Sequence, residues 1–130
     1  MPYKIGYNER QLRIDNIVSG NLSKTELERS TADGIALQHE HRCYNILVDA
    51  FRLESVDSVT DLYELPKQYS EQGVSRATRI ALVLPELEKA RKFVRFYENV
   101  CMNRGWTVRS FETQGEAEKW LSSSQPQAAV

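Results

Sequence analysis

The chain has 130 residues, 41% of them hydrophobic and 27% charged, a composition typical of one globular domain and not of a disordered chain. Its 17 basic and 18 acidic residues give a formal net charge of −1, which disfavours a nucleic-acid partner because phosphate binding needs a clustered basic surface. No apolar run approaches the roughly 20 residues that span a membrane, and residues 1–4 lack the pattern of a signal peptide. We therefore predict a cytoplasmic protein without an integral membrane segment, in which Cys43 and Cys101 stay reduced.

Two short strands are predicted at the start of the chain. Residues 3–7 and 12–18 alternate apolar and polar side chains, and Leu12 opens the inward face of the second run. Because only residues 8–11 separate them, with a polar turn at 8–10, the two strands should pair as an antiparallel hairpin. The segment 19–21, which contains Gly20, should end the second strand.

A helix is predicted next, because Ser23 and Glu26 have the S-x-x-E spacing of a capping box. It should run to about His39. The side chains expected on its inward face are Leu27, Ala32, Ile35, Ala36 and His39.

Two apolar runs predict buried strands, each followed by a helix. The first run, residues 44–48, ends in Asp49, and the helix after it should stop near Pro66. That helix is marked by Val56, Val59, Leu62 and Tyr63. The second run, residues 79–84, leads into a helix that should start at Pro85 and end at Gly105. Its inward stripe is Leu87, Ala90, Val94, Tyr97 and Cys101, widened by Phe93, Phe96 and Val100.

A last strand is expected at 107–111, and the T-x-x-E spacing of Thr113 and Glu116 opens a last helix. That helix should turn Ala117, Trp120 and Leu121 inward. The order ββαβαβαβα predicts an α/β fold with a mixed sheet, because strand–helix–strand crossovers make parallel neighbours. We expect one domain over 1–121 and a flexible tail over 122–130.

Motifs for catalysis or cofactor binding are absent from the sequence: it has no G-x-G-x-x-G, G-x-x-x-x-G-K-[ST], G-x-S-x-G or H-E-x-x-H. The only gathering of metal-ligand residue types is His39 to Cys43, where neighbouring side chains should diverge between a helix end and a strand start. Histidines placed favourably at a helix C-terminus are the better interpretation. We predict no cofactor, no metal and no catalytic residue.

Four polar residues are the candidate regulatory or interaction site: Asp49, Ser55, Asp57 and Ser58. Asp49 is predicted at the C-terminal end of a buried strand, where α/β folds place function. The other three surround the start of the next helix. The simpler interpretation is that they cap free helix amides, and the more specific hypothesis is that a serine there is phosphorylated. An enzyme that uses Asp49 with His39 or His41 is the least favoured hypothesis.

A second candidate set is apolar: Phe93, Phe96, Tyr97 and Trp120. The apolar face of the helix that holds the first three is wider than one sheet needs. Packing within the core is the favoured interpretation, and a dimer interface or a pocket for a small hydrophobic ligand stays open.

Several phrases resemble the STAS-like, or SpoIIAA-like, domain family (sulfate transporter and anti-sigma-factor antagonist). They extend from Leu12 to Leu121, nearly the whole chain, and each is weak while their order and spacing are more specific. The phrases are Ile17-Val18-Ser19-Gly20 before the Ser23–Glu26 helix start, Ile46-Leu47-Val48-Asp49, Arg79-Ile80-Ala81-Leu82-Val83, Phe93 through Arg104-Gly105 into Val108-Arg109-Ser110-Phe111, and Glu116-Ala117-Glu118-Lys119-Trp120-Leu121.

The resemblance implies a four- to five-stranded mixed sheet with an N-terminal hairpin and helices mainly on one face. It implies a regulatory module that binds proteins or small ligands and is not an enzyme. Family antagonists switch by phosphorylation in an Asp-Ser-Ser-Gly-like turn, but here Val59 and Thr60 follow Asp57-Ser58, so the switch pattern is degenerate. We therefore predict a non-catalytic regulatory or protein-interaction module whose partner is another protein or itself as a homodimer. The alternative is a small hydrophobic-ligand or lipid carrier of CRAL-TRIO-like type.

Overall fold

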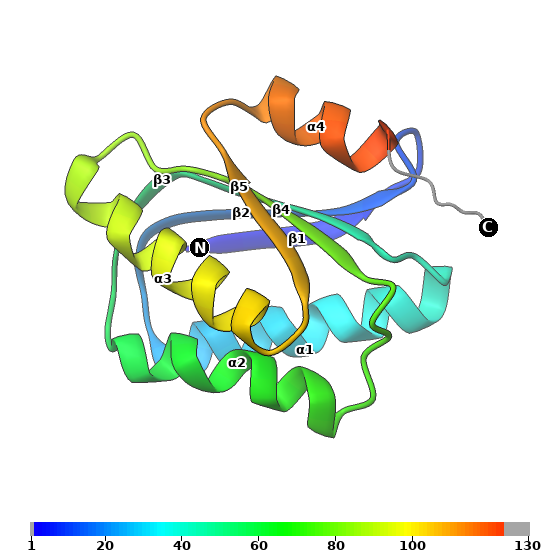
Figure 1. Ribbon diagram of the computed structural model, residues 1–130, viewed down its shortest axis with the longest axis horizontal. Coiled ribbons are helices and arrows are strands. Elements are labelled where there is room, and N and C mark those ends of the chain that lie inside the picture. The colour runs from blue at the N-terminus through cyan, green and yellow to red at the C-terminus, as the bar shows by residue number, and fades with distance from the viewer. Residues whose placement is uncertain (1, 124–130) are drawn as a thin grey trace.

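The computed structural model describes residues 2–123, which form one five-stranded sheet in the order β1-β2-β3-β4-β5 and four helices (Figure 1). β1 pairs with β2 antiparallel, and every later neighbour pair is parallel. The α/β class, the mixed sheet and the N-terminal hairpin are therefore confirmed. The strands are β1 (Tyr3–Asn8), β2 (Arg13–Leu22), β3 (Asn45–Val56), β4 (Arg79–Val83) and β5 (Thr107–Phe111); the helices are α1 (Lys24–His41), α2 (Val59–Glu71), α3 (Glu88–Asn103) and α4 (Gln114–Ser123).

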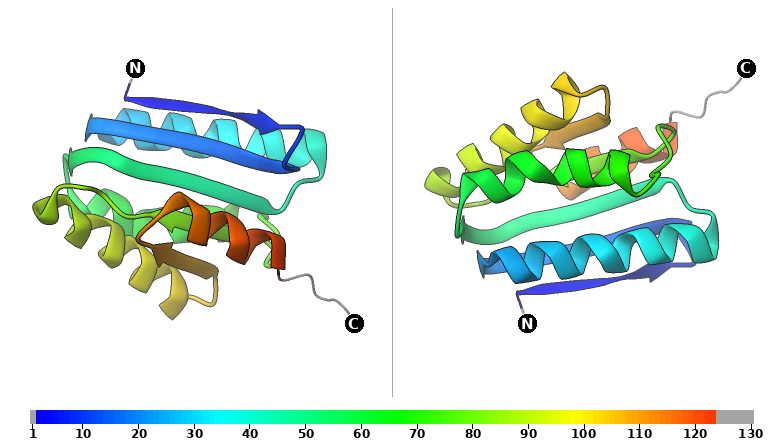
Figure 2. Two further views of the ribbon diagram at one scale, coloured as in Figure 1. Left: turned by 90° about the horizontal axis from the view of Figure 1, so that it is seen from above. Right: turned by 90° about the horizontal axis from the view of Figure 1, so that it is seen from below.

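The helices are divided unequally between the two faces of the sheet. Helices α1, α2 and α3 cover one face, which we call the helical face, and α4 covers the other, the α4 face (Figures 1 and 2). This confirms helices mainly on one face. α1 packs on the hairpin, α2 packs against α3, and α4 lies over β3, β4 and β5. Of the helices in the described part of the chain, none is both long and apolar enough to cross a membrane.

Strands β2 and β3 are longer than predicted. β2 continues through Gly20 to Leu22, and β3 continues past Asp49 to Val56, so both predicted strand ends were wrong. The register shifts between Ile17 and Ser19 and again after Gly20, whose φ is +64°. Because each strand has a neighbour to pair with, the glycine that we expected to break β2 becomes a bulge within it.

Leu12 was wrongly predicted to face inward. It lies in the turn before β2, with a φ of +55° and 65% of its surface exposed. The inward alternation of β2 begins at Ile14, which is 0% exposed. The turn residue cannot join the alternation because its left-handed backbone leaves the extended conformation.

Helix α1 has the predicted capping box but a different buried face. Ser23 Oγ accepts from the Glu26 amide, while Glu26 Oε1 accepts from the Ser23 amide. Ala32, Ala36 and His39 are exposed, contrary to prediction, and Ile35 is half-buried. The buried residues are Leu27, Ser30, Gly34 and Gln38. Small and polar residues can face inward here because Gly34 lets α1 approach β1 and Gln38 donates to Thr78 Oγ1 at 2.9 Å.

Three boundaries differ at the later helices. Pro66 lies inside α2, fully buried, where we expected it to end the helix; Val56 belongs to β3. Pro85 precedes α3, which starts at Glu88 after Leu87, and Leu87 is 43% exposed instead of inward.

Helix α4 begins with the predicted Thr113–Glu116 capping box. It continues through Ser123, two residues into the segment predicted as a tail, and residues 124–130 lie outside the described part. The local capping pattern was therefore a better guide to the start of this helix than composition was to its end.

Candidate functional site

Ser55 and Asp57 are brought together at the ends of β2 and β3 by a residue that the sequence analysis did not select. Ser55 Oγ donates to Asn21 Oδ1 at 2.5 Å, and Asn21 Nδ2 donates to Asp57 Oδ1 at 2.7 Å. The Asp57 amide also donates to Leu22 O at 3.0 Å. Asn21 had been interpreted only as a strand breaker, and its bridging position arises because β2 and β3 stay paired to their ends.

Ser58 is the N-cap of α2. Its backbone is extended, with a φ of −154°, and its Oγ accepts from the Thr60 amide at 3.2 Å. This satisfies one of the free amides at the helix start. Asp61 lies in the first turn, where a carboxylate favours the positive end of the helix dipole.

Asp49 does not belong to this cluster. It lies within β3, between Ile17 of β2 and Val83 of β4, and its Oδ1 accepts from the Phe51 amide at 3.0 Å. Leu47, two residues earlier, packs in the α4-face core, so strand alternation places Asp49 on that face, opposite α1. The predicted position at the end of a strand was therefore wrong, and the histidines of α1 lie on the other side of the sheet.

The segment from His39 to Cys43 has separate local contacts. The His41 ring stacks on Tyr7 with centroids 3.8 Å apart, and Cys43 Sγ lies 3.5–3.6 Å from two backbone oxygens, those of Leu12 and Asn45. Within residues 2–123, no group of three or more His, Cys, Asp or Glu side chains converges as metal ligands do.

The four apolar candidate residues are separated into three places. Phe93 and Tyr97 of α3 face the sheet, while Phe96 is 36% exposed. Trp120 lies on the α4 face, 5.6 Å from the Phe111 ring, with the Arg79 guanidinium over its own ring at 4.2 Å. Only Phe93 and Tyr97 therefore share one site.

That site is a cavity of about 140 Å³ between the sheet and helices α1, α2 and α3. Seen from below, β3 runs between α1 and α2, and both helices and this strand contribute to the cavity wall (Figure 2, right). A cavity of this size costs about 3 kcal/mol if it stays empty, at roughly 24 cal/mol per Å³. The apolar wall includes Val18, Leu27, Ile35, Val48, Ala50, Leu53, Leu62, Leu65, Leu82 and Phe93.

Polar atoms in the cavity wall fall into two groups. Some are paired: Tyr69 and Tyr97 share a hydrogen bond of 2.6 Å between their hydroxyls. Two others, Asn16 Oδ1 and Trp106 Nε1, are buried without a partner. Neither residue was selected from the sequence as a site candidate. Asn16 could have been noticed, because it is an amide among the inward-facing apolar residues of β2.

Burial keeps the groups near this cavity neutral. It raises the pKa of the Cys101 thiol to about 12 and raises the pKa values of Tyr69 and Tyr97 above the ordinary tyrosine value. Among residues 2–123, the side chains that line the cavity include none that carries a formal charge. The cavity wall therefore offers no counter-charge to an anionic ligand.

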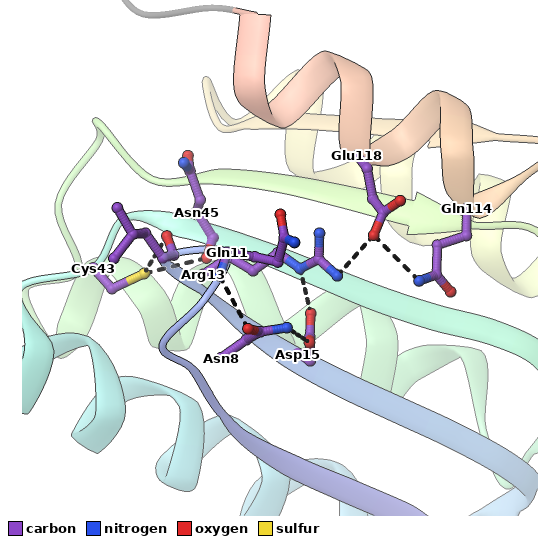
Figure 3. Close-up of polar contacts among 9 residues, drawn as sticks. Asn8, Gln11, Arg13, Asp15, Cys43, Asn45, Gln114 and Glu118 are labelled. Carbon is purple, nitrogen blue, oxygen red and sulfur yellow. Dashed lines mark hydrogen bonds and ion pairs between the residues drawn. The ribbon is translucent and has the colours of Figure 1, made fainter.

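The α4 face has a polar network of a different kind (Figure 3). Arg13, 6% exposed, donates through Nε to Asp15 at 2.6 Å and contacts Glu118 of α4 through Nη2 at 2.9 Å. Asn8 Nδ2 donates to Asp15, and Gln114 Nε2 donates to Glu118. These contacts join the hairpin to α4 and stabilise the layer arrangement.

Comparison with known proteins identifies the fold. No family model matches the chain, and no curated protein matches it. Among solved structures, the anti-sigma factor antagonist SpoIIAA in its unphosphorylated form is similar with a TM-score of 0.63 and 16% identity, over 94% of this chain and 99% of that one.

Two further structures agree. An uncharacterised Shewanella loihica protein of the DUF3478 family, with a SpoIIAA-like fold, gives a TM-score of 0.58 and 16% identity over 92% of this chain and 91% of its own. A proposed anti-sigma factor antagonist from Thermotoga maritima gives 0.55 and 18% over 93% of each chain. The chain therefore has the SpoIIAA-like, STAS-like fold, as the sequence phrases predicted.

Proposed function

We propose that this chain is a non-catalytic regulatory module that acts in the cytoplasm by binding a partner protein at the start of α2. The observation that carries the proposal is the exposed surface beside the Ser58 cap. Val59 and Tyr63 are 47% and 46% exposed and lie four residues apart, hence on one face of α2. Support also comes from the fold, since SpoIIAA is an anti-sigma factor antagonist.

The neighbouring helix α3 also carries exposed apolar residues, and Arg104 after its end reaches Tyr63. α3 packs against α2 and exposes Phe96 and Met102, which are 36% and 55% exposed. The Arg104 guanidinium lies 4.8 Å from the Tyr63 ring centroid. Aromatic residues, methionine and arginine are the types enriched at protein interfaces, which favours a protein over a small ion as the partner.

We further propose that binding does not depend on phosphorylation of Ser58. A phosphate there would gain from the helix dipole, but Asp57 and Asp61 on either side would repel its charge of nearly −2. Ser58 is already used as a cap, and Ser55 already donates to Asn21. The Asn21–Ser55–Asp57 contacts then serve to hold the loop before α2 in place.

The test compares two substitutions of equally exposed residues on opposite sides of the sheet. Val59→Asp lies in the proposed surface, and Ile17→Asp, whose side chain is also 47% exposed, lies on the α4 face by strand alternation. Cross-linking followed by mass spectrometry should recover a partner with the wild type and with Ile17→Asp, and lose it with Val59→Asp. Equal recovery with both variants would place the interface elsewhere and contradict the proposal.

Light scattering of the same three proteins distinguishes self-association from binding of another protein. If the partner is a second copy, the wild type and Ile17→Asp should be dimeric and Val59→Asp monomeric. A monomer in all three cases rejects the homodimer.

A lipid carrier has less support. Sites for drug-sized ligands measure about 300–1,000 Å³, and the cavity here is about 140 Å³. Neither Phe96 nor Trp120, two of the four residues predicted to line such a site, contributes to its wall. A long-chain lipid would therefore require α1 and α2 to move apart.

A further inference from the structure

The cavity on the helical face has three properties that indicate which kind of molecule could bind there. Its volume of about 140 Å³ resembles that of an engineered cavity of roughly 150 Å³ that binds benzene. Its wall is largely apolar. Within the described part of the chain, the residues that form the wall include no Asp, Glu, Lys, Arg or His, so a charged molecule would be buried without a counter-charge, which is strongly unfavourable.

The cavity wall also contains two buried polar atoms that lack partners. Asn16 Oδ1 comes from β2 and Trp106 Nε1 from the residue before β5, and Trp106 is only 4% exposed. Buried polar atoms in native proteins are nearly always hydrogen-bonded. Elsewhere in this wall they are, since Gln38 donates to Thr78 Oγ1 and Tyr69 pairs with Tyr97. Both unpartnered atoms therefore belong to residues that line the cavity.

We propose that this cavity binds a small, neutral, mainly apolar molecule, about the size of one substituted aromatic ring, whose hydroxyl group hydrogen-bonds the Asn16 amide. Trp106 forms part of the wall that contacts it. Carboxylates, phosphates and nucleotides are excluded by the uncharged wall, and long-chain lipids by the volume. The inference does not depend on the proposed protein interface, because it uses different residues.

The experiment is a titration of the isotopically labelled protein, followed by NMR, with three small probes. Phenol and toluene differ in having a hydroxyl or a methyl on the same ring, and benzoate adds a charge. Trp106 faces the cavity and Trp120 lies on the α4 face, so their indole N–H signals report the two sides separately. The variant Trp120→Phe assigns them.

We expect phenol to shift the Trp106 signal in a saturable manner at millimolar concentrations and to leave Trp120 unaffected. Toluene should bind about three- to tenfold more weakly, the range expected for one lost hydrogen bond, and benzoate should not bind. The absence of a saturable Trp106 shift with both phenol and toluene would overturn the proposal, as would binding of benzoate equal to that of phenol.

Three variants test the named residues. Asn16→Leu should abolish the preference for phenol over toluene and raise the melting temperature of the free protein, because it removes an unpaired buried amide. Ala50→Leu should fill the cavity and weaken both probes. Ile17→Thr, the adjacent residue on the other face, is the control and should change neither affinity. An unchanged phenol preference in Asn16→Leu overturns the role of the amide, whatever Ala50→Leu does.

Discussion

The two faces of the sheet are filled in different ways. On the α4 face, Ala81 and Ala117 are both 0% exposed, so helix and sheet meet through small side chains. On the helical face, larger leucines, valines and aromatic rings surround a cavity of about 140 Å³. One helix therefore packs closely against its face, while three helices leave space on the other.

The fixed position of α4 has a polar cause. The helix starts with the Thr113–Glu116 capping box. Glu118, in its middle, pairs with Arg13. Near its end, Arg79 donates to the Trp120 and Leu121 carbonyls at 2.7 and 3.0 Å. On the helical face, α1 packs on the hairpin and α2 on α3, and the cavity lies where these two units meet. Polar contacts therefore hold the α4 layer in place, whereas the layer that depends on apolar packing leaves a cavity.

The largest expected effect is a loss of folding stability at alkaline pH, caused by Cys101 in the core of the helical face. The pKa of Cys101 is about 12 in the folded protein against 9.0 when unperturbed, so the unfolded state loses its proton first as pH rises. Stability is thus fully present below pH 9 and falls between pH 9 and 12, by roughly 4 kcal/mol at about 1.36 kcal/mol per tenfold change in proton affinity. Urea unfolding against pH measures it. Cys101→Val should reduce the slope between pH 9 and 10, below the range where the tyrosines add to it. Part of the slope should remain, because burial also raises the pKa of the Cys43 thiol. An unchanged slope would contradict the assignment.

A matched pair of substitutions compares packing on the two faces. Ala81→Leu should destabilise the protein by about 1–3 kcal/mol, because the added carbons meet α4 with no room to spare. Ala50→Leu, at a residue 2% exposed that lines the cavity, should cost less than about 0.5 kcal/mol or stabilise. Chemical denaturation of both variants tests this; equal costs would show that the cavity does not accept side-chain volume.

The polar network on the α4 face should matter less. Asp15→Ala removes the closest partner of the buried Arg13 guanidinium and should lower the free energy of unfolding by about 1–2 kcal/mol. This loss is smaller than for a fully buried pair because the Asp15 side chain is 30% exposed. Arg13→Met should cost less, since it leaves no buried charge unpaired. Glu88→Gln, at an exposed ion pair with Arg91, is the control and should change stability by under about 0.5 kcal/mol. If Arg13→Met is the most damaging of the three, the guanidinium contributes more stability than its unpaired charge would cost, which contradicts the prediction.

The smallest effects are expected at the two helix caps, one on each face. Ser23→Ala and Thr113→Ala should each cost about 1 kcal/mol, and Ser23→Gly only a few tenths. Because capping is local, the two alanine variants should be alike despite the different packing above them. A cost at Ser23 several times that at Thr113 would indicate that α1 depends on its cap because its packing is loose.

Sequence reasoning was most successful where the signal lies within a few residues. Both capping boxes, β4 and β5 were placed correctly, because cap spacing and short apolar runs act locally. It failed on the buried face of α1, where the weak apolar pattern favoured Ala32 and Ala36 while Gly34 and Gln38 are buried. It also placed Asp49 at a strand end, because nothing in residues 44–49 shows that β2 will keep pairing with β3 to Val56.

The candidate sites depended still more on tertiary structure. Ser55, Asp57 and Ser58 were selected from their place before a helix, and the structure brings the first two together through Asn21. The set Phe93, Phe96, Tyr97 and Trp120 was selected from apolar periodicity, which cannot tell one face of the sheet from the other. The amide of Asn16 was visible in the sequence as an exception to alternation, but only the cavity makes it a candidate ligand contact.

The sequence by itself determined the element order and the parallel crossovers, since period, caps and breakers are short-range properties of the chain. The STAS-like fold was implied by the resemblance of its phrases to that family. The tertiary structure alone decided how far β2 and β3 pair, which side of α1 is buried, and where space remains between α1 and α2. Those features depend on contacts between residues far apart in the chain, such as Asn21 with Asp57, 36 positions apart, and Gln38 with Thr78, 40 positions apart. No local pattern encodes such contacts, because each depends on where the other elements pack.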